Sequence, residues 1–218
     1  LTVEKKVVGG SDREFEFTIE LKDEHGQALP NSYSTKKSDG TTGTITSGGA
    51  FTLRGGESIT ISGLPVGTRY TVTEEADNNF VTSVDGEETD TASGEIRTGE
   101  KVTFTNTEVG DLTVSKTAAG SGADRNQDFT FTVTLDDNTI DGVYGDMNFE
   151  DGVATFTLKH SESKTAEGLP AGTEYTVTES GNDGYKVESE GATGVIAAGE
   201  TVKAAFTNTK EEGPRPGP

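Results

Sequence analysis

Hydrophobic and polar residues alternate along the chain in short runs, and turn residues separate these runs. In the segment 14–22, Phe15, Phe17, Ile19 and Leu21 occupy every second position, a period typical of a β-strand with one buried face. Gly, Asn and Asp gather between the runs, where tight turns favour them. No segment keeps an apolar period of 3.6 residues over three helical turns. The pattern therefore predicts an all-β chain.

The first half of the chain contains seven such runs, whereas residues 23–50 lack a clear one. The expected strands lie at about 1–8, 14–22, 50–54, 57–62, 68–75, 79–84 and 100–106. Seven short strands in roughly 100 residues are typical of an immunoglobulin-like β-sandwich. We expect residues 23–50 to form a long loop or excursion.

One series of motifs is present twice. LTVEK at 1–5 returns as LTVSK at 112–116, GLPVGTRYTVTE at 63–74 returns as GLPAGTEYTVTE at 168–179, and FTNT at 104–107 returns at 206–209. The middle motif recurs after 179 − 74 = 105 residues, which is far longer than a solenoid repeat.

The sequence therefore predicts two tandem immunoglobulin-like β-sandwich domains, at 1–108 and 109–210. A very short linker is expected near 108–111. Residues 211–218, which are rich in Pro and Gly, are expected to form a disordered tail or linker. We also expect the chain to be part of a longer protein.

The charge of the chain excludes several classes of partner. Its 18 basic and 38 acidic residues give a formal net charge of −20. Such an acidic surface disfavours binding to nucleic acid or to an anionic membrane, and no apolar run is long enough for membrane insertion. Because the chain has no Cys, it can form neither a disulfide nor a thiolate metal site.

Three of the repeated strands carry a polar residue on the face that otherwise points to the core. Lys5 shares its face with Leu1 and Val3, because side chains two residues apart point to the same side of a strand. The same count places a Glu inward on a middle strand and an Asn inward on the last strand. The six residues are Lys5, Glu74 and Asn106 in the first domain, and Lys116, Glu179 and Asn208 in the second.

Each of these residues alone has an ordinary explanation. A Lys at the end of an inward row can extend to solvent, a Glu at a strand end is a surface charge, and an Asn before a linker is a turn residue. Because all three recur with the same parity in both halves, we expect them to gather in the interior of each domain. A buried Lys–Glu pair that is hydrogen-bonded to the Asn is one possible outcome.

The same cluster also permits a covalent reaction. Burial favours the neutral forms of Lys and Glu, a neutral amine is a nucleophile, and a neutral acid can polarise the Asn carboxamide and pass a proton to its nitrogen. The product would be an amide between two side chains, formed once per domain without turnover, so no enzyme is predicted. Candidates for a dry pocket are Phe15, Phe17, Phe104, Phe129, Phe131 and Phe206.

The repeated motifs resemble those of the streptococcal pilin isopeptide-linkage domains. These domains are a branch of the collagen-adhesin B-type (Cna B-type) folds of Gram-positive pili and surface adhesins. The resemblance covers both halves and rests on LTVxK, GLPxGTxYTVTE and FTNT in this order. It implies the cross-links Lys5–Asn106 and Lys116–Asn208, with Glu74 and Glu179 as catalytic acids.

Adjacent residues in the first domain compete for two of these roles. Lys6 follows Lys5 and Glu75 follows Glu74, whereas the second domain has Thr and Ser at the corresponding positions. That comparison selects Lys5 and Glu74. The last strand also differs, because Gly199 to Phe206 is two residues longer than Gly99 to Phe104. An even insertion leaves Asn208 on the core face unless a β-bulge intervenes.

The resemblance implies a structural stalk of a surface adhesin or pilus-like protein. Such a protein is extracellular and anchored to the cell wall through a part of the parent that is not present here. Its partners would be neighbouring domains of the same polypeptide, with a host ligand bound through another domain. No cofactor is predicted.

A ligand-binding adhesin module is the alternative, with residues 23–50 as its expected binding surface. The segment 136–142 faintly resembles a calcium loop, but it lacks the full ladder of ligands and the closing Glu. No metal is therefore predicted.

Overall fold

The computed structural model describes all 218 residues and contains strands and turns but no helix. It therefore has no helix that is long and apolar enough to cross a membrane. The chain divides into two compact units, Leu1–Glu108 and Val109–Pro218. The predicted all-β class, with two tandem β-sandwich domains, is confirmed.

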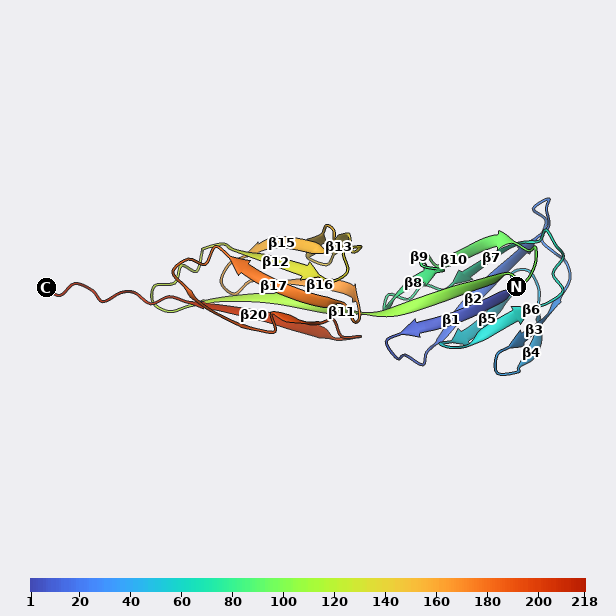
Figure 1. Ribbon diagram of the computed structural model, residues 1–218, viewed down its shortest axis with the longest axis horizontal. Helices are drawn as coiled ribbons and strands as arrows, with labels where there is room; N and C mark the ends of the chain where they lie inside the picture. Colours follow the sequence, from blue (N-terminus) through green and yellow to red (C-terminus); the bar gives the residue numbers. More distant parts are fainter. The chain divides into compact units, whose positions relative to one another are not determined.

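The first unit is built from two packed sheets (Figure 1). One sheet has the order β9-β8-β11-β1-β6-β3-β4, and the other has the order β10-β7-β2-β5. The strands are β1 (Thr2–Val8), β2 (Glu14–Lys22), β3 (Tyr33–Lys37), β4 (Thr42–Ile45), β5 (Ala50–Arg54), β6 (Ser58–Ile61), β7 (Arg69–Glu74), β8 (Phe80–Val84), β9 (Glu87–Glu88), β10 (Thr91–Glu95) and β11 (Lys101–Ala119).

The second unit repeats this plan with fewer strands. One sheet has the order β18-β20-β11-β16, the other has the order β15-β12-β17-β19, and β13 and β14 form a separate hairpin. The strands after β11 are β12 (Phe129–Leu135), β13 (Gly142–Tyr144), β14 (Met147–Phe149), β15 (Val153–Leu158), β16 (Ser163–Pro170), β17 (Glu174–Ser180), β18 (Lys186–Glu190), β19 (Thr193–Val195) and β20 (Thr201–Thr209).

The cores lie between the sheets and follow from the alternation in the sequence. Along β2 the side chains of Phe15, Phe17, Ile19 and Leu21 are buried and those between them are exposed. Apolar residues of the facing strands complete one core per unit. Each unit thus excludes water from a single layer between its two sheets.

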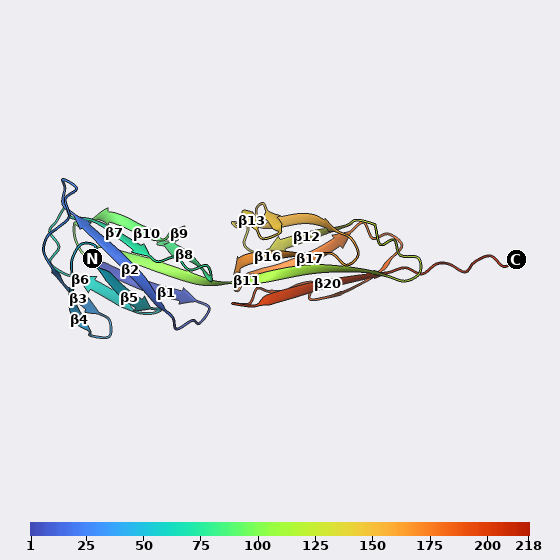
Figure 2. The same cartoon turned by 180° about the vertical axis from the view of Figure 1, so that it is seen from behind.

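The first and last strands of each unit are neighbours and run parallel. In the first unit β1 pairs with β11, with Lys5 opposite Phe104. In the second unit β11 pairs with β20, with Lys116 opposite Phe206, and Figure 2 shows these two strands side by side. Parallel strands need a long connection between them, and here the connection is the rest of the domain.

Residues 23–50 differ from the sequence-based expectation. They contain β3 and β4, which extend the first sheet beyond β6, so the prediction of a long loop is wrong. These strands escaped notice because three of the four side chains of β4 are exposed. An edge strand of this kind lacks the alternation that marks a half-buried one.

The expected linker near 108–111 is also absent, because β11 continues without a break from Lys101 to Ala119. Gly110, which fell in the expected linker, lies within the strand. A Cβ at this position would clash with the Ala197 carbonyl group, so glycine permits a close approach of two backbones. Residues 211–218 form no strand.

A glycine lies beneath a buried tyrosine in each unit. Gly94 pairs with Tyr70 across β10 and β7, and a Cβ at Gly94 would lie 2.7 Å from Tyr70 Cζ. Gly194 and Tyr175 repeat the arrangement, with a Cβ at Gly194 lying 2.7 Å from Tyr175 Oη. The rings therefore occupy the space that a larger residue would need.

We expect Gly94→Ala to lower the free energy of unfolding by about 1–3 kcal/mol, because the added methyl group must displace the Tyr70 ring. Gly99→Ala is the matched control, because a Cβ there meets nothing within 4 Å, and it should stay within about 0.5 kcal/mol of the parent chain. Thermal and urea unfolding would measure both. Equal stability of the two variants would contradict this packing.

Candidate functional site

The first unit buries a lysine, a glutamate and an asparagine in mutual contact. Lys5 comes from β1, Glu74 from the end of β7 and Asn106 from β11, and none is more than 1% exposed. Lys5 Nζ lies 2.9 Å from Glu74 Oε2 and 3.2 Å from Glu74 Oε1. Asn106 Nδ2 donates a hydrogen bond to the same Oε1. The carboxyl group thus bridges the amine and the carboxamide.

The second unit repeats this cluster with Lys116, Glu179 and Asn208. Lys116 Nζ lies 2.9 Å from Glu179 Oε2, and Asn208 Nδ2 donates a hydrogen bond to Glu179 Oε1. The side chains of Lys116 and Glu179 are 0% and 1% exposed, and Asn208 is fully buried. All six residues singled out in the sequence therefore meet in two clusters of three.

Strand register brings the three side chains together. Lys5 lies opposite Phe104 on the neighbouring strand, so Asn106 is two residues further along the same face. Glu74 reaches the pair from β7 in the facing sheet. Lys6 and Glu75 are exposed, as expected for residues next to inward-pointing ones.

The second unit has the same register despite its longer approach to the last strand. Lys116 lies opposite Phe206, and Asn208 lies opposite Ala118. The pairing of β11 with β20 proceeds from Asp111 to Ala119 without a shift. The two extra residues therefore lie within β20, where they lengthen the pairing at its start without a bulge and leave the orientation of Asn208 unchanged.

Aromatic rings line both clusters. Lys5 Nζ lies 4.4 Å from the centre of the Phe15 ring and 5.9 Å from that of Phe17. Phe17 in turn packs edge-on against Phe104, with 5.1 Å between the ring centres. In the second unit Lys116 Nζ lies 4.3 Å from the Phe129 ring. Rings at this distance exclude water and attract a cation through their faces.

In each unit a second aromatic residue packs against the phenylalanine ring that contacts the lysine. Phe80 packs edge-on against Phe15 at 5.1 Å between ring centres, and Tyr185 packs against Phe129 at 5.4 Å. Both follow the buried glutamate by six residues, since 80 − 74 = 6 and 185 − 179 = 6. The loop after the glutamate strand therefore closes this end of each sandwich.

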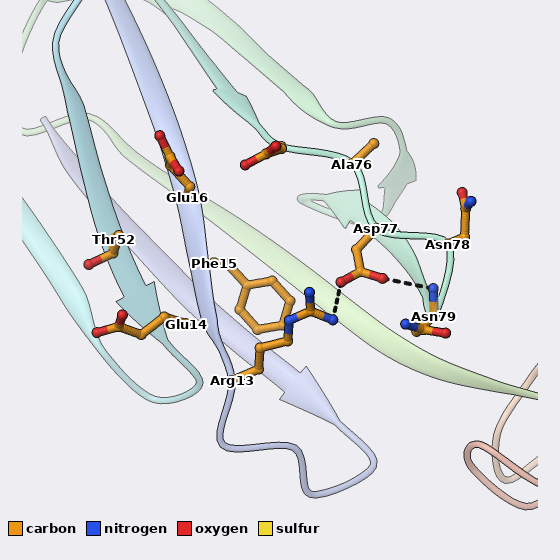
Figure 3. Close-up of a pocket in the computed structure, with 10 residues that line it drawn as sticks. Arg13, Glu14, Phe15, Glu16, Thr52, Ala76, Asp77, Asn78 and Asn79 are labelled. Atoms are coloured by element: carbon orange, nitrogen blue, oxygen red, sulfur yellow. Dashed lines mark hydrogen bonds and ion pairs between the residues drawn. The ribbon is translucent and has the colours of Figure 1, made fainter.

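Figure 3 shows part of this region of the first unit, with Phe15 and the loop residues Asp77, Asn78 and Asn79. Arg13, before β2, forms an ion pair with Asp77 on the loop after β7. Asp77 Oδ1 also accepts a hydrogen bond of 2.9 Å from the backbone N–H of Asn79. Outside them lies a surface hollow of about 700 Å³, whose lining includes Phe15. Phe15 thus separates this hollow from Lys5.

Burial shifts the ionisation of Lys5, Glu74 and Lys116 toward neutrality. Burial lowers the pKa of the Lys5 ammonium, and the contact with Glu74 only partly opposes this. Burial raises the pKa of the Glu74 carboxyl against the opposing effects of Lys5 and Asn106. Burial also lowers the pKa of Lys116. In the first unit the neutral amine and the neutral acid are therefore more accessible than in water.

Each asparagine leaves one polar atom without a partner. Asn106 Oδ1 and Asn208 Oδ1 are buried and accept no hydrogen bond. An unsatisfied buried acceptor costs about 1–3 kcal/mol. A half-turn of the carboxamide would exchange Nδ2 and Oδ1 and bring Oδ1 to the glutamate, where a protonated carboxyl could donate to it.

Sequence reasoning missed three residues that complete these sites. Phe80 and Tyr185 could have been found, because both repeats place an aromatic residue at the same offset from the glutamate. Asn182 donates a hydrogen bond of 3.1 Å from its Nδ2 to Glu179 Oε1. It could not have been found from the repeats, because the residue three positions after the glutamate of the first repeat is Asp77.

The chain contains no cluster of three or more His, Cys, Asp or Glu residues that could hold a metal ion. In the segment 136–142, Asp137 Oδ1 accepts hydrogen bonds from the backbone N–H and the hydroxyl of Thr139. Internal hydrogen bonds thus account for that turn.

Comparison with known proteins identifies related sequences. A family model described as Domain of unknown function (DUF7601) matches residues 1–108 and again residues 110–210. A pilus tip adhesin, Cpa, from Streptococcus pyogenes is 44% identical over 87 residues, which is 37% of this chain and 13% of that protein. A pilin from Streptococcus pyogenes serotype M1 is 38% identical over 93 residues, which is 35% of this chain and 26% of the pilin.

Solved structures give weaker similarities. A crystal form of the pilus-presented adhesin Cpa matches with 26% identity and a TM-score of 0.42, covering 66% of this chain and 37% of that one. The major pilin from Streptococcus pyogenes matches with 20% identity and a TM-score of 0.42, covering 97% of this chain and 98% of that one.

The variant Asn106→Ala should have a stability that depends on the ionisation of Glu74. Burial raises the pKa of Glu74 above its ordinary value of 4.5, so the folded chain keeps this proton at a pH where the unfolded chain releases it. The contribution of Glu74 to the free energy of unfolding therefore falls as the pH rises from 4.5 through the raised pKa. The fall is at most about 1.4 kcal/mol per pH unit.

Urea unfolding between about pH 4.5 and 7 would measure this dependence, with Asn106→Ala/Glu74→Gln as the control. The difference in stability between the single and the double variant removes the contribution of all other carboxylates. It should decrease with rising pH. A difference that increases would show that the site favours the ionised carboxylate.

Proposed function

The chain belongs to the family described as Domain of unknown function (DUF7601), and we propose that its two domains are stalk modules of a pilus or surface adhesin. Each module is closed by an intramolecular isopeptide bond, Lys5–Asn106 in the first domain and Lys116–Asn208 in the second. One observation carries the proposal. A buried amine, acid and carboxamide meet at the same strand register in both domains.

The reaction joins the lysine nitrogen to the asparagine side-chain carbon. A proton moves from Lys5 to Glu74, which leaves a neutral amine and a neutral acid. The amine lone pair attacks Asn106 Cγ while the acid hydrogen-bonds to Oδ1 and stabilises the developing negative charge. Glu74 then takes one proton from Nζ and gives one to Nδ2, the Cγ–Nδ2 bond breaks, and ammonia leaves. Glu74 still holds the proton that it first took from Lys5, and passing this proton to the departing ammonia, which leaves as ammonium, restores the carboxylate. Glu74 therefore acts as a catalyst.

The environment of the cluster supports this chemistry. The shifted pKa values of Lys5 and Glu74 favour the neutral pair, and the surrounding phenylalanine rings exclude water that would compete as a nucleophile. Neighbouring strands hold the reacting groups together, which supplies the effective concentration that an unactivated amide requires. The free Oδ1 of Asn106 is the atom that the acid would activate.

The bond would strengthen each domain against unfolding. Linking Lys5 to Asn106 closes a loop of 106 − 5 = 101 residues. In the chain-entropy model, closing a loop of about 100 residues is worth about 4.7 kcal/mol. That is comparable with the whole stability of a small domain, about 5–15 kcal/mol, and it requires no cysteine.

The parallel pairing of the first and last strands suits a protein under tension. Force that enters at the start of β1 and leaves the first unit along β11 at Glu108 pulls the two strands past each other, which loads their hydrogen bonds together. A covalent link between Lys5 and Asn106 would carry this force directly from one strand to the other. The strands between them would then bear little load.

The relatives support a location at the cell surface. The matched proteins are a pilus tip adhesin and a pilin, and the chain spans only 13% and 26% of their lengths. We therefore assign to this chain a structural, non-enzymatic role outside the cell. Its proposed partners are neighbouring domains of the same polypeptide.

A ligand-binding module is the second candidate, and one groove favours it. The groove has a volume of about 510 Å³, lies beside β4 and β5, and is lined by residues that include Thr44, Ile45 and Phe51. It includes part of the segment 23–50. A glycan array probed with the chain and with a Thr44→Lys variant would test it, and binding that the variant abolishes would favour this function.

We expect the intact mass of the purified chain to be lower than the sequence mass by two molecules of ammonia, one for each bond. Glu74→Gln should restore the mass of one ammonia and Glu179→Gln that of the other, because each variant lacks the acid of one domain. Mass spectrometry of the intact protein would measure this. A wild-type chain at full sequence mass would refute the proposed function.

Single-molecule pulling should release neither domain of the wild-type chain. In Asn106→Ala the first domain should unfold and release its 106 − 5 = 101 enclosed residues, or about 350 Å at 3.3–3.6 Å per residue. Asn208→Ala is the matched control and should release only the 208 − 116 = 92 residues of the second domain. Release of either length by the wild-type chain would contradict a covalent bypass.

A further inference from the structure

The two buried glutamates, Glu74 and Glu179, differ in the residues that contact them. Glu74 Oε1 contacts Lys5 and Asn106, and Glu74 Oε2 contacts Lys5. All of its contacts therefore come from the two groups that would react. Glu179 contacts Lys116 only through Oε2.

A third residue takes the free position on Glu179. Asn182 lies three residues further along the chain, in the loop after β17, and its Nδ2 donates a hydrogen bond of 3.1 Å to Glu179 Oε1. Asn208 donates to the same oxygen. Asn182 is thus a donor to the catalytic carboxyl that takes no part in the bond.

The first domain has no such donor. The residue three positions after Glu74 is Asp77, a carboxylate, which pairs with Arg13 instead. Figure 3 shows Asp77 directed at Arg13. The two domains therefore share the reacting groups and differ in this one neighbour of the acid.

We propose that Asn182 is a positioning residue that slows formation of the second isopeptide bond and so makes the first domain close before the second. This inference rests on the proposed function. It adds to that function an order in which the two bonds form, and this order is set by a loop residue that is not one of the three reacting groups.

The physical reason lies in the proton that Lys116 and Glu179 share. The reactive form holds a neutral amine and a neutral acid, and the resting form holds an ammonium and a carboxylate. The two forms have the same number of protons, so their ratio depends on local contacts. A donor such as Asn182 stabilises the carboxylate and thereby lowers the population of the reactive form.

Asn182 also competes for the oxygen that the reaction needs. The acid must hydrogen-bond to the Asn208 carboxamide, and in the second domain Oε1 is shared between Asn182 and Asn208. In the first domain Asn106 shares Oε1 only with Lys5, and that contact weakens when the amine becomes neutral. Both effects slow the second reaction relative to the first.

The test follows both bonds in the same full-length chain. Cell-free synthesis is stopped, samples are taken over time into acid and denaturant, and the branched and unbranched peptides of each domain are quantified by mass spectrometry after digestion. In the wild-type chain the second bond should form more slowly than the first.

Two variants remove the donor. Asn182→Ala should accelerate the second bond by about tenfold, the factor that corresponds to about 1.4 kcal/mol. Asn182→Asp keeps the size of the side chain and recreates the residue type of the first domain, so it should accelerate the second bond in the same direction. The first bond is the internal control, and its rate should not change.

Asp183→Ala is the matched control for a general effect on the loop, because Asp183 is the exposed neighbour of Asn182, and it should leave both rates unchanged. Acceleration by both Asn182 variants would support the proposal. A second bond that is unchanged or slower in Asn182→Ala would overturn it, because a residue that merely holds the site together has that effect. Absence of both branched peptides from the wild-type chain would instead refute the proposed function.

Discussion

The parallel pairing of the first and last strands is the constraint on which the rest of each domain depends. It places Lys5 opposite Phe104 and leaves Asn106 two residues further along the same inward face. The second domain has the same register. The facing sheet then has only to supply a carboxyl group between the amine and the carboxamide, which it does with Glu74 and Glu179.

Burying these groups is unfavourable unless they satisfy one another. A buried lysine or glutamate alone would lose several kcal/mol of hydration, of the order known for unpaired ions. Mutual contact reduces this cost, and the remaining shift toward neutral forms prepares the groups for reaction. An arrangement that is poor for simple stability, with a free Oδ1 on each asparagine, is thus well suited to forming a bond once. The bond would then supply mechanical strength in a chain without cysteine.

The sequence predicted those parts of the fold that follow from side-chain alternation. The period of two placed Lys5 and Glu74 inward and their neighbours Lys6 and Glu75 outward, as the structure has them. It could not predict β3, which has a single apolar residue, or β4, an edge strand with three exposed side chains, because neither shows an apolar alternation. It also placed Gly110 in a linker, although that glycine serves close backbone packing within a strand.

The alternation of hydrophobic and polar residues could not predict the contacts of loop residues either. Asn182 approaches Glu179 from an irregular segment, where residue spacing does not determine side-chain direction. Only the folded chain reveals that the two domains differ at this position. Comparing the repeats shows which residues are shared, and the structure shows what the unshared ones contact.

The most direct test of the central claim is a crystal structure of the chain at atomic resolution. The account predicts continuous electron density between Lys5 Nζ and Asn106 Cγ, at the amide bond length of about 1.33 Å, and no density for Asn106 Nδ2. Separate side chains at a non-bonded distance of about 3 Å or more, with Nδ2 still present, would contradict it.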